Sequence, residues 1–317
     1  MSRVVVTDHA FSGVARERAA AQSAGAAFSE HQCRSEAETL EAVEGANVVF
    51  NNFAPMNART MGVMAKGATV IRYGVGVDNV DLPAAKNLGI HVCNVPDYGV
   101  EEVADHASAM ALSLARKLAR YDAGIRAGEW KIGAMVDHVR SLSQSTVGLV
   151  GFGRIARALA RRMQAFGATV IAYDPYVSAE DAEAAQAKMR TLAEVIRTAD
   201  ILSLHVPLTP ETRHMIGHAE LATMKKGAIL INVSRGGLVD EAALAEALEN
   251  GHLSGAGLDV FEKEPLPADA ALLSAPHTIV SPHAAFFSDA SVNRLQQLAA
   301  EEGLRALKGE PLRCALT

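Results

Sequence analysis

Short apolar runs alternate with helical patterns over the first hundred residues. The runs are rich in β-branched or aromatic residues and have the length of strands, at 4–6, 48–50, 69–71 and 90–92. Helical patterns lie between them, near 13–24, 35–43, 57–65 and 81–88. Strands that alternate with helices are typical of a parallel sheet covered by helices on both faces. The pattern therefore predicts a small α/β domain in this part of the chain.

The same alternation returns after a long helical pattern at 101–127, whose acidic start and more basic end suit the helix dipole. Strands are predicted at 146–150, 169–173, 201–205, 228–233, 255–259 and 278–281, with helices between them that include 153–166 and 240–249. Residues 128–145 contain the single tryptophan, Trp130, and little periodicity, so we expect a connecting loop that is a candidate contact with a partner subunit. An amphipathic helix at 289–307 is expected to pack back on the first domain.

A glycine-rich turn joins the strand at 146–150 to the helix at 153–166. Its sequence, Gly151-Phe152-Gly153-Arg154-Ile155-Ala156, has the spacing of a dinucleotide-binding turn. Gly151 allows the turn, Gly153 lets the backbone approach a pyrophosphate, and Ala156 keeps the helix close to the strand. The helix N-terminus then offers N–H groups and a positive dipole end to the phosphates.

Asp174 ends the next predicted strand, eighteen residues after Ala156, where an acid should meet the adenosine ribose hydroxyls. A carboxylate there would repel the 2′-phosphate of NADP, so we expect NAD. The alternative is a structural turn followed by a loop-capping aspartate, and the joint occurrence of turn and acid favours the nucleotide site. The fold prediction is α/β with two doubly wound parallel-sheet domains: a Rossmann domain at 99–285 inserted into a flavodoxin-like domain made of 1–98 and 286–317.

Composition narrows the class of partner. The 317 residues are 49% apolar and 21% charged, with a net charge of −6 and no basic block, which argues against nucleic acid and anionic membranes. Cys33, Cys93 and Cys314 are isolated and lack metal-ligand spacing, as free thiols in a reducing compartment would. No signal-peptide or membrane-span pattern is evident, so we expect a cytoplasmic protein. Many binding proteins would share these features.

Three charged side chains follow predicted strands of the second domain. Arg235 follows the strand at 228–233, Glu264 follows 255–259, and His283 follows 278–281. Ligands of open α/β sheets bind at the carboxyl ends of the strands, so these side chains should share one rim with the nucleotide. Taken singly, each is as easily a surface charge or loop residue, but their succession after a dinucleotide motif favours a catalytic site.

Other polar and aromatic residues carry weaker signals. His214 and His218 are four residues apart but lack an adjacent glutamate and a further ligand set, so no metal site is predicted. We expect structural roles for Asp105 and His106. Phe286-Phe287 is either a hydrophobic staple of the last helix or an apolar wall of a substrate pocket, and its closeness to His283 favours the wall.

In these motifs the chain resembles the D-isomer-specific 2-hydroxyacid dehydrogenases, over nearly its whole length. The matching motifs, in family order, are Gly151–Ala156 with Asp174, His205-Val206-Pro207-Leu208-Thr209, Asn232–Gly237, Gly257-Leu258-Asp259-Val260-Phe261, Glu264-Pro265 and Ser281-Pro282-His283-Ala284-Ala285. Within the family, the segments 72–79 and 283–286 are similar to the C-terminal binding protein and phosphoglycerate dehydrogenase-like branch.

The resemblance implies a role for each catalytic candidate. His283 should give a proton to the carbonyl oxygen of a 2-oxo acid and take it back in the oxidation direction. Glu264 should hold the imidazole and favour its charged form. Arg235 should bind the substrate carboxylate and polarise the carbonyl.

The resemblance also implies two binding sets. Asp259 should accept a hydrogen bond from the nicotinamide carboxamide. Together with it, the expected cofactor-binding residues are Gly151, Phe152, Gly153, Arg154, Ile155, Asp174, His205, Val206, Pro207, Thr212, Val233, Ser234 and Ala285. The expected substrate-binding residues are Arg72, Gly74, Val75, Gly76 and Phe286, with specificity resting on loops at 51–56, 72–77, 97–100 and 286–288.

The expected activity is NAD-dependent transfer of a hydride between nicotinamide and a small 2-hydroxy or 2-oxo acid, such as glyoxylate, hydroxypyruvate or a related acid. The alternative is an NAD(H)-sensing dimeric binding protein of the C-terminal binding protein type. The presence of Arg235, Glu264 and His283 favours catalysis. The resemblance further suggests a homodimer built on the NAD-binding domain.

Overall fold

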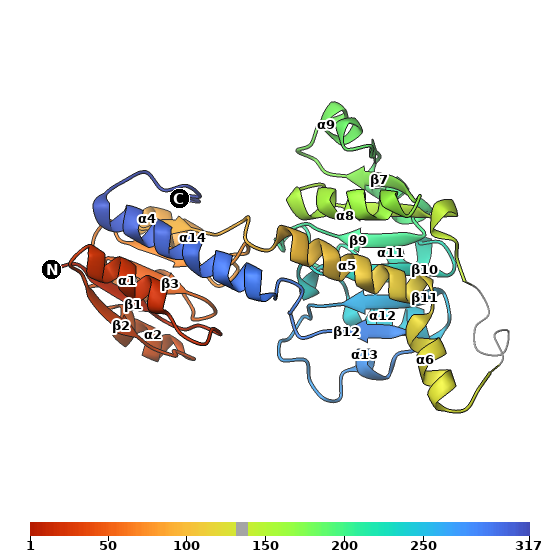
Figure 1. The fold of residues 1–317 in the computed structure, drawn as a ribbon, viewed down its shortest axis with the longest axis horizontal. Coiled ribbons are helices and arrows are strands. Elements are labelled where there is room, and N and C mark those ends of the chain that lie inside the picture. The colour runs from red at the N-terminus through yellow and green to blue at the C-terminus, as the bar shows by residue number, and fades with distance from the viewer. Residues whose placement is uncertain (131–138) are drawn as a thin grey trace. The chain divides into compact units, whose positions relative to one another are not determined.

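The computed structural model describes residues 1–130 and 139–317. The chain divides into two compact units, the first made of Met1–Gly99 and Phe287–Thr317 and the second of Val100–Phe286. Each unit is built on one parallel sheet (Figure 1). The division lies one residue from each of the boundaries expected at 98/99 and 285/286.

The first unit has a five-stranded sheet in the order β2-β1-β3-β4-β5, and all neighbours are parallel. Its strands are β1 (Arg3–Val6), β2 (Ala27–Glu30), β3 (Val48–Asn51), β4 (Thr69–Arg72) and β5 (His91–Cys93). Its helices are α1 (Ala15–Ser23), α2 (Glu36–Val43), α3 (Ala58–Gly62), α4 (Leu82–Leu88) and α14 (Asp289–Lys308). This is the flavodoxin-like order, in which the chain reverses direction across the sheet at β1.

Helix α14 joins the first unit although it comes from the far end of the chain, and it lies beside α1 in Figure 1. Its first turn is closed by a capping box, in which Ser288 and Ser291 exchange hydrogen bonds. Arg294 donates to the Tyr98 carbonyl at 2.7 Å, and Gln296 donates to the Gly13 carbonyl at 2.8 Å. These bonds tie the returning helix to the loops of its unit.

The second unit has a seven-stranded parallel sheet in the order β12-β11-β10-β9-β6-β7-β8. Read from β8, the first six strands follow the Rossmann order 3-2-1-4-5-6. The strands are β6 (Thr146–Val150), β7 (Thr169–Tyr173), β8 (Lys188–Met189), β9 (Ile201–Leu204), β10 (Ala228–Asn232), β11 (Leu253–Leu258) and β12 (Thr278–Val280). Separate apolar clusters fill its two faces, as helices on both sides of a parallel sheet require.

The α-helices of this unit are α5 (Val100–Ala115), α6 (Leu118–Arg126), α8 (Arg154–Ala165), α9 (Ala179–Ala184), α10 (Leu192–Thr198), α11 (His218–Thr223), α12 (Glu241–Glu249) and α13 (Ala271–Ser274). Two short 3₁₀ helices are η1 (Leu142–Gln144) and η2 (Gly236–Leu238). The predicted fold class of two doubly wound α/β domains is confirmed.

Three local features differ from the sequence pattern. Strands β2 and β8 were not predicted, because both lie at sheet edges and lack the apolar run of a central strand. The single helix predicted at 101–127 is wrong: it is broken at Lys117, whose backbone is left-handed (φ 57°) and whose amino group donates to the Ser254 carbonyl at 2.9 Å. Of the loop expected at 128–145, residues 131–138 lie outside the described part of the structure.

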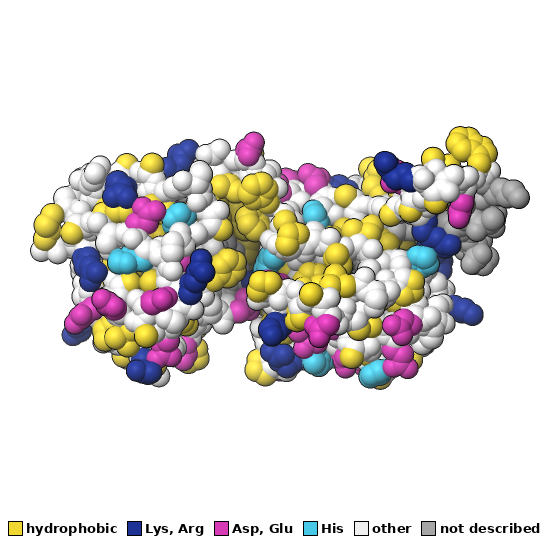
Figure 2. All heavy atoms as spheres, turned by 90° about the horizontal axis from the view of Figure 1, so that it is seen from below, with side chains coloured by type: hydrophobic (Ala, Val, Ile, Leu, Met, Phe, Trp, Pro, Cys, Tyr) yellow, Lys and Arg dark blue, Asp and Glu magenta, His cyan; other side chains and the backbone are white. Residues whose placement is uncertain are grey.

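On the face drawn in Figure 2, acidic and basic side chains are interspersed over both units. Within residues 1–130 and 139–317, no helix has both the length and the apolar character needed to cross a membrane.

Candidate active site

The glycine-rich turn leaves β6 at the carboxyl edge of the second sheet. Gly151 has φ 89°, and a Cβ built on it would lie 2.7 Å from the His205 carbonyl oxygen. Both the backbone angle and the close approach of the loop after β9 therefore exclude a side chain at this position. A dinucleotide-binding turn requires this tight backbone conformation.

Helix α8 begins immediately after this turn. Its N-cap residue, Gly153, provides no side-chain hydrogen bond to the first turn, and the N–H groups there have no acceptor inside the helix. A twelve-residue helix with such an N-terminus attracts an anion. The residues present thus fit a bound pyrophosphate.

Asp174 lies beside the turn at the end of β7. Its Oδ2 accepts from the Phe152 N–H at 2.8 Å, and its Oδ1 accepts from the Tyr176 N–H at 2.9 Å. The Phe152 side chain is fully buried under the Arg157 guanidinium, so only the main chain of Phe152 faces the turn. Asp174 is therefore already fixed in place next to the predicted phosphate site.

The loops after β9 and β10 are joined to each other. The Ser234 hydroxyl donates to the Val206 carbonyl at 2.6 Å, and the Thr212 hydroxyl donates to the Pro207 carbonyl at 2.8 Å. His205 has its Nε2 2.8 Å from the Ser203 hydroxyl, and burial lowers its pKa to about 4. His205 is therefore neutral at physiological pH and adds no charge to these loops.

Arg235 follows β10 in a loop with little freedom. Asn232 ends the strand, and its side chain donates to the Arg235 carbonyl at 2.8 Å and accepts from the Ser234 N–H at 3.1 Å. A Cβ on Gly236 would lie 1.8 Å from the carbonyl carbon of Phe261. The loop that carries Arg235 thus packs backbone to backbone against the segment that leads to Glu264.

Glu264 and His283 form a direct pair, with His283 Nδ1 2.8 Å from Glu264 Oε2. The other oxygen of Glu264 accepts from the Phe261 N–H at 3.0 Å. Burial alone would raise the pKa of Glu264, but these two hydrogen bonds, with the charges of His283 and Arg235, lower it below the usual value. The carboxyl is therefore ionised and accepts only, so the proton of the pair is on Nδ1.

Asp259 is almost completely buried next to this pair. Its carboxylate accepts from the N–H groups of Ala284 and Ala285, both at 2.8 Å. Both bonded residues lie directly after His283. Asp259 thus organises the loop of the imidazole, whether or not it also meets a nicotinamide carboxamide.

The predicted substrate residues of the first unit lie at the end of β4: Arg72 is its last residue, and Gly74, Val75 and Gly76 follow it. An Arg72 Nη1–H donates to the Tyr73 carbonyl at 2.6 Å. The Asn94 amide donates to the Val75 carbonyl at 2.7 Å, and the Val95 N–H donates to the Gly74 carbonyl at 2.9 Å. The glycine loop is thus held from the segment that follows β5.

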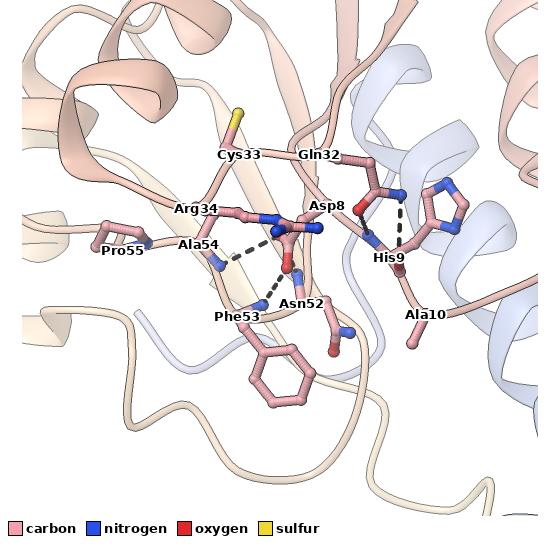
Figure 3. A pocket seen from close by; sticks show the side chains of 10 residues that line it. All are labelled: Asp8, His9, Ala10, Gln32, Cys33, Arg34, Asn52, Phe53, Ala54 and Pro55. Atoms are coloured by element: carbon pink, nitrogen blue, oxygen red, sulfur yellow. Dashed lines mark hydrogen bonds between the residues drawn. The ribbon is translucent and has the colours of Figure 1, made fainter. Parts of the chain in front are cut away.

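A cavity of about 260 Å³ lies at the carboxyl ends of β1, β2 and β3 in the same unit (Figure 3). Its lining includes Asp8, whose carboxylate accepts from the N–H groups of Asn52, Phe53 and Ala54 at 2.6–3.2 Å. The ring of Phe53 lies 6.0 Å from the Arg72 guanidinium. Asp8 therefore fixes part of the 51–56 loop in which specificity was expected.

The structure thus brings four of the predicted residues to one edge of the second sheet: Arg235, Asp259, Glu264 and His283. Phe286 packs against the core of this unit, and Phe287 is largely exposed. His214 pairs with Glu262 and His218 with Glu246, and no group of three potential metal ligands exists among the described residues. Asn232, which begins the motif Asn232–Gly237, was given no role of its own; its signal is an amide at the end of an otherwise apolar strand.

The sequence model of the D-isomer specific 2-hydroxyacid dehydrogenase NAD-binding domain matches residues 108–285. The chain belongs to this dehydrogenase family. The matched residues form most of the second unit, which is its NAD-binding domain.

Similar proteins carry several enzyme names. The chain is 43% identical to D-3-phosphoglycerate dehydrogenase of Bacillus subtilis over 77% of its own length and 46% of that protein. It is 39% identical to glyoxylate reductase of Korarchaeum cryptofilum over 81% of its own length and 78% of that protein. The solved D-lactate dehydrogenase of Aquifex aeolicus, complexed with NAD and lactic acid, superposes with a TM-score of 0.87 at 29% identity, covering 97% of this chain and 96% of that chain.

The chain spans about half the length of the phosphoglycerate dehydrogenases that it matches.

The NAD-binding turn allows a direct test. Gly153→Ala should weaken NADH binding roughly tenfold or more, the effect of losing about one charge-assisted hydrogen bond, because a methyl group would hold the pyrophosphate away from the helix. The same change should leave thermal stability unaltered, since a Cβ at Gly153 meets nothing within 4 Å. Fluorescence titration with NADH and thermal unfolding measure the two effects.

Gly151→Ala is the matched variant, and it should lower both NADH affinity and thermal stability because its Cβ meets the His205 backbone. Unchanged NADH affinity in the Gly153 variant would contradict this assignment of the phosphate site.

Proposed function

We propose that this chain is an NAD-dependent dehydrogenase that interconverts a small 2-hydroxy acid and its 2-oxo acid, such as glyoxylate, hydroxypyruvate or a related acid. One observation carries the proposal: the 2.8 Å pair of His283 and Glu264 lies at the carboxyl edge of an NAD-binding sheet, with Arg235 on the neighbouring strand. The names of the relatives, glyoxylate reductase and D-lactate dehydrogenase among them, support the substrate class.

NADH, when bound, would supply the hydride for the carbonyl carbon of the 2-oxo acid, and the carbonyl oxygen would then gain negative charge. His283 neutralises this charge. Its Nδ1–H is held by Glu264, which leaves Nε2 to give a proton to the oxygen. The ionised Glu264 stabilises the imidazolium and fixes the ring orientation, as the carboxylate of a catalytic triad does.

Arg235 binds the substrate carboxylate through its planar donor fork and draws charge from the adjacent carbonyl. In the first unit, the proposal gives substrate-binding roles to Arg72, Gly74, Val75 and Gly76, with the N–H groups of Val75 and Gly76 as the donors to a carboxylate. Arg72 adds positive charge to this side, and Phe286 supplies an apolar wall. By holding the carboxylate, Arg235 orients the adjacent carbonyl toward His283.

The turn at 151–155 and the loops after β9 and β10 would hold NAD. The residues proposed for these loops are His205, Val206, Pro207, Thr212, Val233 and Ser234. Asp174 selects NAD over NADP, because its carboxylate would repel a 2′-phosphate. Asp259 Oδ1 accepts from Ser281 and Ala284, while Oδ2 accepts from Ala285 and has a lone pair left for the carboxamide. The proposal includes a homodimer through the NAD-binding domain and a cytoplasmic location.

The activity is tested by following NADH oxidation with glyoxylate, hydroxypyruvate, pyruvate and phenylpyruvate. His283→Ala should lower kcat at least about a hundredfold, the usual contribution of a positioned acid. Arg235→Ala should mainly lower kcat/KM, because the substrate carboxylate loses its charged partner. His218→Ala, in an exposed pair with Glu246, is the control and should retain full activity.

Full activity of both site variants would refute the assigned roles. No turnover of any acid by the native chain, with a protein partner captured only when NADH is present, would favour the NAD(H)-sensing binding protein instead.

The Glu264–His283 pair also predicts how the rate of reduction depends on pH. Because the pKa of Glu264 is lowered, its carboxylate persists through neutral and mildly acidic pH, and the pair is lost only as the pH falls through that lowered value. In Glu264→Gln the imidazolium loses its carboxylate partner. The optimum for 2-oxo acid reduction should therefore move to lower pH, with reduced kcat at neutral pH.

The pH profile of kcat measures this shift, and Glu262→Gln two residues away is the matched control. A profile that is identical in Glu264→Gln and the native chain would show that the carboxylate does not act on His283.

A further inference from the structure

The backbone of His283 needs outside support. Its φ of 53° lies in the left-handed region, which costs free energy for a residue with a Cβ. Such a conformation persists only where neighbouring groups hold it, and it is typical of functional sites. Two hydrogen bonds of the His283 N–H, to the carbonyls of Asp259 at 2.7 Å and Ser281 at 3.1 Å, supply part of this support.

Asp259 supplies the rest from its side chain. Each oxygen accepts one backbone N–H after His283, Oδ1 from Ala284 and Oδ2 from Ala285. Oδ1 also accepts from the hydroxyl of Ser281, which precedes His283 in the chain, at 2.6 Å. The carboxylate is 1% exposed, so its orientation decides where the whole turn at 281–285 lies.

Helix α5 fixes that orientation. The Ser281 hydroxyl has a single hydrogen, and it is used toward Asp259, so the oxygen can only accept from a further partner. That partner is His106 on α5, with Nε2 2.9 Å from the hydroxyl oxygen. His106 Nε2 is therefore the donor, and its 3.9 Å separation from Asp259 Oδ1 makes the serine the link between them.

We propose that His106 and Ser281 are positioning residues for proton transfer by His283. The chain of donors runs from His106 to Ser281 to Asp259 and holds the left-handed turn that presents the imidazole. The proposal rests on the proposed function, in which His283 is the acid and base. It gives His106 a role that its place in the sequence did not indicate.

The test uses two pairs of variants of the full chain. Ser281→Ala and His106→Leu remove one donor each, and kcat should fall by about ten- to a hundredfold, the effect of a displacement near 1 Å. Ser281→Thr keeps a hydroxyl and His106→Gln keeps an N–H near the position of Nε2, so both should recover most of the lost kcat. In Ser281→Ala and His106→Leu the Kd for NADH, from fluorescence titration, should rise by a smaller factor than kcat falls, because most of the proposed cofactor contacts lie outside the 281–285 turn.

A second measurement distinguishes an effect on the position of His283 from a nonspecific structural effect of the Ser281 substitution. In a His283→Ala background, Ser281→Ala should cause no further loss of the residual reduction rate, because the group that it positions is gone. An equal fold-loss in both backgrounds, or a loss confined to NADH affinity, would overturn the positioning role. Full activity of His283→Ala itself would refute the role assigned to His283. No turnover of any 2-oxo acid by the native chain would refute the proposed function, which is a distinct result.

Discussion

A single buried carboxylate holds together the edge of the sheet where the chemistry is proposed. Asp259 directly follows strand β11, and both of its oxygens accept hydrogen bonds from the loop after β12. An unpaired charge at this depth would be very unfavourable, so the loop must close over it in one arrangement. The left-handed turn of His283 follows from that closure.

The other catalytic candidate is placed by a steric constraint. Gly236 lets the loop after β10 touch the segment after β11 with no side chain between them. Arg235 and Glu264 are consequently held on adjacent segments, and the positive charge of Arg235 helps to keep Glu264 ionised. Packing and electrostatics therefore act on the same small set of residues.

Most of the second unit could be read from the sequence, because its signals are local. A buried parallel strand is a short apolar run, and the residue after it must lie at the carboxyl edge. That rule alone brought Arg235, Glu264 and His283 together. Strands β2 and β8 were not found by this rule because neither contains an apolar run, whereas β5 and β12 lie at the opposite sheet edges and were predicted.

Contacts between segments that are far apart in the chain cannot be predicted from local sequence patterns of this kind. The long helical pattern breaks at Lys117, whose amino group donates to the carbonyl of Ser254, 137 residues away in the chain. His106 reads as one polar position of a helix, and only the fold brings it to Ser281, 175 residues later. The Asn232 amide donates to the carbonyl of nearby Arg235, and the sequence does not show this contact because it depends on the shape of the loop.

The central claim is that the residues at the carboxyl edge of the second sheet catalyse stereospecific reduction of 2-oxo acids by NADH. The most direct measurement is chiral analysis of the product formed from pyruvate, hydroxypyruvate or phenylpyruvate, alongside the NADH consumed. The account predicts one D-2-hydroxy acid formed for each NADH oxidised, as membership of the D-isomer-specific family implies. An L-2-hydroxy acid, or no NADH oxidation with any of these acids, would contradict it.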